Sequence, residues 1–114
     1  MSERRLHLYL MDILESSKAI LEFTKDISFE YFCNDRKTYS AVIRELEVIG
    51  EAVGKLPDDL KQKHSNVEWQ DIKDFRNMLI HEYFGVDLEI VWKVIQDDLP
   101  ALIKETDDIL KGLN

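Results

Sequence analysis

The amino-acid sequence predicts an all-α protein, folded as an antiparallel four-helix-type bundle with one or two short extra helices. The chain of 114 residues contains only 4 Gly and 2 Pro, too few for the many turns of an all-β fold. Apolar residues recur at alternating spacings of three and four, which is the period of an amphipathic helix. Because each such segment presents one apolar ridge, the segments are expected to pack together as a single domain over residues 1–114.

Four apolar stripes predict four main helices, over about residues 3–24, 36–55, 66–83 and 87–111. Short helical or turn segments are expected near residues 28–33 and 57–64. The stripes consist of Leu6, Leu10, Ile13, Ser17 and Ile20; Val42, Leu46, Ile49, Val53 and Leu56; Ile72, Phe75 and Leu79; and Trp92, Ile95, Leu99, Leu102, Thr106 and Ile109.

Residues at the predicted helix ends support these boundaries. Ser65 and Glu68 have the spacing of a capping box, in which each side chain accepts a hydrogen bond from the other residue's backbone N–H. Gly85 is expected to end the third main helix, and Asp87 to cap the fourth. Pro100 lies inside the fourth stripe, so that helix is either kinked there or split into two.

The amino-acid composition limits the possible cellular compartments and binding partners. The net charge of −8 argues against a non-specific nucleic-acid coat, although a small site for one phosphate is compatible with it. A single cysteine, Cys33, excludes an internal disulfide and a thiolate metal cluster. The N-terminus lacks an apolar signal segment, and no apolar run approaches the ~20 residues of a membrane span. We therefore expect a cytoplasmic protein without a membrane association, a metal or a cofactor.

The third main helix carries a group of residues suited to phosphate chemistry. At about 100° per residue, Asp74, Asn77 and His81 lie on the arc opposite the apolar stripe, and Arg76 lies between the two arcs. A histidine can exchange a proton near neutral pH, and an arginine can stabilise the charge on a phosphate in its transition state. Such a set can cleave RNA without a metal, with the 2′-hydroxyl as internal nucleophile.

Two alternatives stay open at this point. An arginine and a histidine on a polar helix face are more often solvated surface residues, and an imidazolium also favours a helix C-terminus. If the set is catalytic, one histidine cannot easily serve as both acid and base, which a symmetric dimer would solve. His7 and His64 show no ligand spacing and are expected on the surface.

Residues 76–83, Arg-Asn-Met-Leu-Ile-His-Glu-Tyr, resemble the Arg-x4-His-x-Tyr signature of HepT-like toxins in the HEPN superfamily. Residues 44–52 and 55–57 resemble that family's second-helix block. Trp69 precedes Arg76 by seven residues, as in the family's usual approach to the motif. The likeness covers most of residues 4–112.

This resemblance implies a HEPN bundle that forms a homodimer and acts as a metal-independent endoribonuclease on an RNA substrate. It implies that Arg76 and His81 are catalytic, with Asn77 in a supporting role at most. It also implies an MntA-like nucleotidyltransferase antitoxin that transfers AMP to Tyr83. From its position in the second main helix, Glu51 is either a carboxylate that holds Arg76 in place or a solvated surface residue.

A second class of function is a non-catalytic helical module that binds nucleotide or scaffolds a nucleotidyltransferase. Gly50, in the middle of the second main helix, suits both classes because it allows another helix to approach closely. That close approach belongs either to a dimer interface or to a crossing within one chain.

Overall fold

The computed structural model describes residues 1–81 and 86–113, with only the backbone for Ile80 and His81. Within these residues the chain forms helices and no strand, so the predicted all-α class is confirmed. The helices are α1 (Glu3–Phe23), α2 (Phe29–Asn34), α3 (Arg36–Lys55), α4 (Asp58–Lys63), α5 (Trp69–His81), α6 (Leu88–Asp97) and α7 (Leu99–Gly112).

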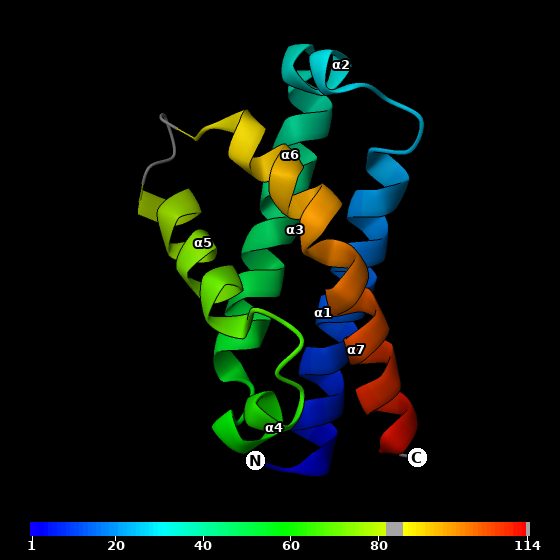
Figure 1. Ribbon diagram of the computed structural model, residues 1–114, viewed down its shortest axis with the longest axis vertical. Helices are drawn as coiled ribbons and strands as arrows, with labels where there is room; N and C mark the ends of the chain where they lie inside the picture. Colours follow the sequence, from blue (N-terminus) through cyan, green and yellow to red (C-terminus); the bar gives the residue numbers. More distant parts are fainter. Residues whose placement is uncertain (82–85, 114) are drawn as a thin grey trace.

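The long helices form the predicted antiparallel bundle (Figure 1). Helix α3 lies between α1 and α5, and α7 packs against the other side of α1. Helices α6 and α7 follow one another along the fourth side of the bundle. The short helices α2 and α4 lie at opposite ends, in a molecule measuring 41 × 29 × 22 Å.

Most of the residues in the four apolar stripes lie in the core, but the fully buried Phe32 of α2 is not among those that the periodicity selected. Leu10, Ile13 and Ile20 of α1 are fully buried, and so are Val42 and Val53 of α3. Burying one such aliphatic side chain contributes about 1.5–3 kcal/mol, so each buried stripe member stabilises the bundle. Ser17 and Thr106, the two polar members of the stripes, are also fully buried.

Two of the predicted boundaries agree with the structure. The Asp87 carboxylate caps α6 by accepting a hydrogen bond of 2.9 Å from the backbone N–H of Glu89. The fourth stripe is split into two helices rather than kinked. Helix α6 ends at Asp97, and Pro100 lies in the first turn of α7, where its missing N–H costs no helical hydrogen bond.

The predicted capping box at Ser65 and Glu68 is wrong. Helix α5 begins at Trp69, and the carbonyl of Glu68 accepts its first helical bond, from the N–H of Ile72 at 3.1 Å. The preceding segment is a turn, stabilised by the Trp69 indole N–H, which donates to the carbonyl of His64 at 2.9 Å. The hydrogen bond from the Trp69 indole to the His64 carbonyl therefore stands in place of the predicted Ser65 cap. The predicted stop at Gly85 lies outside the described residues.

His64 is half-buried rather than on the surface as predicted. Its imidazole Nδ1 lies 2.5 Å from a carboxylate oxygen of Glu105 in α7. The other oxygen of Glu105 accepts a hydrogen bond from the amide of Asn66 at 2.8 Å. This cluster joins the turn before α5 to α7. In the described part of the chain, none of the helices has the length and apolar character to cross a membrane.

Candidate active site

Helices α3 and α5 cross in direct contact at Gly50 and Arg76. A Cβ atom added to Gly50 would overlap the Cβ and Cγ atoms of Arg76, and would lie 3.5 Å from its Cα. The absence of a side chain at Gly50 therefore allows the two helices to approach this closely. Of the two alternatives for Gly50, the structure shows the crossing within one chain.

The side chain of Arg76 is half-buried at this crossing, whereas the sequence suggested a largely exposed residue. Its Nε atom is screened from solvent and has no hydrogen-bond partner among the described residues. Buried N–H groups are nearly always paired, so an unpaired one in a motif arginine needs an explanation. Because Nε itself is closed to solvent, an external anion can reach Arg76 only through the terminal nitrogens of its guanidinium.

The remainder of α5 has the predicted division into two faces. Ile72 and Leu79 are buried and Phe75 is half-buried, facing the core. Asp74 and Asn77 are exposed on the opposite face. The helix therefore presents a polar surface at the motif that the other described residues leave exposed.

Of the other predicted site residues, His81, Tyr83 and Glu51, only Glu51 has a side chain within the described part of the chain. His81 is the last residue of α5, and its side chain lies outside the described part, as does the whole of Tyr83. Glu51 is exposed beside Gly50, and no ion pair to Arg76 is found among the described residues. Arg76 and Gly50 are thus brought together, and Glu51 is not joined to them.

An open groove of about 490 Å³ lies between α3 and the segment that enters α6. Its volume is within the range of small-molecule sites, about 300–1,000 Å³. We call it the basic groove. Its lining residues are Arg36, Tyr39, Ser40, Ile43, Arg44, Glu47, Val86 and Leu88.

The basic groove and the Gly50 crossing share one face of α3. Positions 36, 40, 43, 47 and 50 follow one another at spacings of four and three, which places them on one stripe of a helix. Arg36 and Arg44 supply two positive charges, and Glu47 lies 3.9 Å from Arg44. Neither arginine was predicted as a site residue from the sequence, although their spacing of eight residues places both on one side of a helix.

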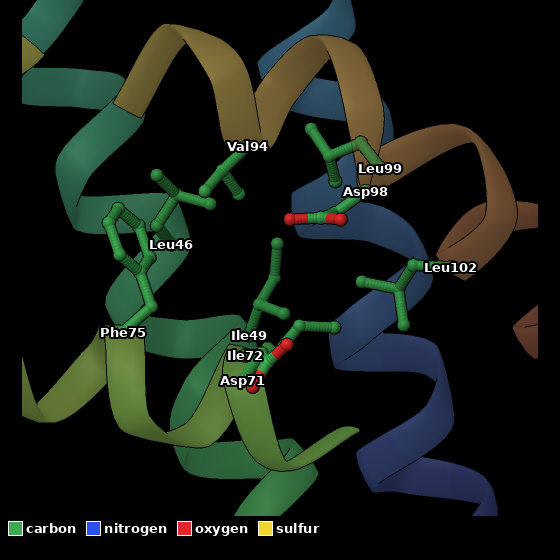
Figure 2. Close-up of a pocket in the computed structure, with 9 residues that line it drawn as sticks. All are labelled: Leu46, Ile49, Asp71, Ile72, Phe75, Val94, Asp98, Leu99 and Leu102. Atoms are coloured by element: carbon green, nitrogen blue, oxygen red, sulfur yellow. The ribbon is translucent and has the colours of Figure 1, made fainter. Parts of the chain in front are cut away.

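A second hollow lies between α3, α5 and the junction of α6 with α7 (Figure 2). Most of its lining is aliphatic or aromatic, but the carboxylates of Asp71 and Asp98 also face it. Burial raises the pKa of Asp98, and the neighbouring carboxylates of Asp97, Asp71 and Glu68 raise it further. With about 20 Å³ of space, this hollow holds little more than one water molecule.

Among the side chains that the structure describes, no three His, Cys, Asp or Glu residues are grouped to bind a metal ion. The described polar side chains on the motif face of α5 and in the basic groove include arginines, an amide, a serine and a tyrosine, together with the carboxylates of Asp74 and Glu47. The arginines and the neutral polar groups can contact a phosphate or a base.

The chain is similar to known proteins along nearly its whole length. Residues 13–109 match the family described as HepT-like ribonucleases. A protein of Thermococcus cleftensis named "Probable ribonuclease HepT" is 48% identical, over 82% of this chain and 86% of its own length. A candidate RNase of Methanocaldococcus jannaschii is 44% identical, over 99% of this chain and 93% of its own. No solved structure matches the chain significantly.

Proposed function

Because this chain belongs to the family of HepT-like ribonucleases, we propose that it is a metal-independent endoribonuclease whose catalytic residues are Arg76 and His81. The family and the names of the relatives support the class of ribonuclease. The observation that carries the proposal for Arg76 is the packing of its stem on the backbone of Gly50, where helices α3 and α5 cross. An arginine whose stem is positioned by packing can present the terminal nitrogens of its guanidinium to a phosphate.

In the proposed reaction, the 2′-hydroxyl of the substrate attacks the adjacent phosphorus and the bond to the 5′-oxygen breaks. One imidazole removes the proton from the 2′-hydroxyl, and a second, protonated imidazole donates its proton to the leaving 5′-oxygen. The products are a 2′,3′-cyclic phosphate and a 5′-hydroxyl. Arg76 stabilises the additional negative charge of the pentacoordinate phosphate.

Since one His81 cannot easily perform both proton transfers, the proposed enzyme is a homodimer with two copies of the motif in one cleft. Asp74 and Asn77, exposed on the motif face of α5, leave that face accessible to a second chain. Asn77 then borders the cleft and serves at most as a supporting residue.

The proposed enzyme is the toxin of a toxin–antitoxin pair, and its partner is an MntA-like nucleotidyltransferase. The partner would transfer AMP from ATP to the phenol oxygen of Tyr83, two residues after His81, with release of pyrophosphate and the phenol proton. The added phosphate brings negative charge close to Arg76, where it competes with the RNA phosphate.

Cleavage of a labelled single-stranded RNA by the purified chain tests the nuclease, with and without EDTA. We expect cleavage that survives EDTA, produces a 2′,3′-cyclic phosphate, and disappears in His81→Ala. Activity that needs added magnesium would contradict the mechanism, and a chain that binds RNA without cutting it would favour the non-catalytic module.

Arg76→Lys is the informative substitution at the arginine, because lysine retains the aliphatic stem that packs on Gly50. Lysine also retains the positive charge but loses the planar fork of donors. We expect cleavage to fall by about 100-fold or more, with a melting temperature close to that of the wild type. Arg76→Ala is a poorer test because it also removes packing at the crossing.

A further inference from the structure

We propose that the basic groove binds the phosphodiester backbone of single-stranded RNA beside the cleavage point, through Arg36 and Arg44. This inference rests on the proposed function for the identity of the ligand. It adds a substrate-binding site on α3, separate from the motif on α5.

The two arginines are spaced to contact different phosphates of one strand. They are eight residues apart on one face of α3, which corresponds to about 12 Å along the axis at 1.5 Å per residue. Ser40 lies midway between them and adds a hydroxyl donor. A row of donors along a helix suits an extended polyanion better than a single small anion.

The groove leads to the motif from two directions. On α3, the lining residue Glu47 stands about one helical turn before Gly50, which contacts Arg76. On the opposite wall, Val86 and Leu88 follow closely after the motif segment in the sequence. A strand lying in this groove is therefore directed along the motif, with its scissile phosphate beyond the groove.

The charges and the apolar surfaces of the groove fit the same ligand. Arg36 is exposed, and the side chain of Arg44 is 72% exposed, so neither is committed to a structural role in the core. Tyr39 and Ile43 are half-buried between them and offer a surface against which a base can stack. Glu47 offsets part of the positive charge, so the affinity is expected to be modest.

Most of the molecule repels a polyanion, because the chain carries a net charge of −8. The pair Arg36 and Arg44 then determines where an RNA strand can bind and along which direction it lies. Non-specific binding elsewhere on the surface is disfavoured for the same reason. The test can therefore distinguish this groove from general electrostatic attraction.

The test measures RNA binding by the full-length chain carrying His81→Ala, which prevents cleavage during the measurement. Fluorescence anisotropy of a labelled single-stranded RNA of mixed sequence gives the Kd at several salt concentrations. Arg36→Ala with Arg44→Ala is compared with Arg4→Ala with Arg5→Ala. The control pair lies exposed on α1, outside the groove, and changes the net charge equally.

We expect the groove pair to raise the Kd about tenfold, and to reduce the slope of log Kd against log salt by about 1.4, for two lost phosphate contacts. The control pair should leave both quantities near their original values. Arg36→Lys with Arg44→Lys should recover most of the binding, because lysine also contacts phosphate as a point charge. Recovery by lysine distinguishes a charge contact from a loss of structure.

Equal weakening in both alanine pairs, or no weakening in the groove pair, would overturn the groove assignment. So would the absence of RNA binding at low salt. These outcomes are separate from failure of the proposed nuclease, which is judged by cleavage in the chain that retains His81. A chain that cuts RNA but binds it equally well without the two arginines would lose only this inference.

Discussion

The stem of Arg76 lies directly against the backbone of Gly50, where a Cβ atom would overlap it. This contact holds the motif helix α5 against α3 and limits the positions that Arg76 can adopt. Gly54, one turn further along α3, has a different environment. A Cβ added there would meet only the Cε of Lys73, at an ordinary contact distance of 3.8 Å.

Gly50→Ala is expected to destabilise the bundle by about 1–3 kcal/mol, since the new methyl group forces α3 and α5 apart. The overlapping atoms belong to the base of the Arg76 side chain, which cannot move without a shift of the backbone. The cleavage rate should fall even under conditions where the variant stays folded, because a shift of α5 also displaces Arg76. Urea unfolding and the RNA assay measure the two effects.

Gly54→Ala is the matched control on the same helix. We expect it to stabilise the protein by about 0.5–1 kcal/mol through the helix propensity of alanine, with unchanged cleavage. If Gly50→Ala behaves in the same way as Gly54→Ala, the crossing does not depend on the missing side chain.

Light scattering at micromolar concentration should give twice the mass of one chain. Asp74 and Asn77 are exposed on the face of α5 opposite the core, which leaves that face accessible to a second copy. Asn77→Arg, which places a bulky charge next to its symmetry mate, should shift the protein toward monomer and lower cleavage with it. A wild-type chain that is only monomeric would remove the paired-histidine mechanism.

Tyr83 should carry AMP when the chain is produced together with its nucleotidyltransferase, detected as a mass increase that maps to this residue. Tyr83→Phe should abolish the increase and leave an active nuclease that the partner no longer inhibits. The phenol oxygen is the atom that accepts the nucleotide, and phenylalanine preserves the ring without it. An adduct on another tyrosine would move the assignment there.

Glu105→Gln should lower stability by about 1 kcal/mol at pH 7, because it weakens the contacts with His64 and Asn66. Hydrogen bonds from Asn66 and His64 hold the pKa of Glu105 below its ordinary value. Its stabilising contribution is therefore present above the unfolded pKa and disappears as the pH falls through the folded one. The difference in melting temperature from the wild type should narrow as the pH falls through the acidic range, and Glu22→Gln, at an exposed position of α1, serves as the control.

Asp98→Asn should have the opposite effect on stability, raising the melting temperature at pH 7. Burial and the adjacent carboxylates raise the pKa of Asp98, so the folded state binds its proton more tightly than the unfolded state. The cost of its charge is absent below the unfolded pKa and grows as the pH rises through the folded one. Thermal melts from pH 3 to 7 should show a gain that appears only toward neutral pH, unlike in the exposed control Asp12→Asn.

The sequence by itself determined the helices, because their signals are local. Alternating spacings of three and four selected residues such as Ile13, Val42 and Leu102, which are buried in the structure. The cap at Asp87 followed from its place before an apolar stripe. The Arg-x4-His-x-Tyr motif was also readable in one short segment, and it led to the family that the comparisons show.

Only the tertiary structure decided which residues meet across the bundle. The capping box at Ser65 failed because the indole of Trp69 turns back onto the carbonyl of His64. His64 contacts Glu105, 41 residues away, and Gly50 contacts Arg76, and no local spacing encodes either pair. Such contacts depend on the distance between packed helices and on the positions of the side-chain termini. Both are determined by the packing of the whole chain.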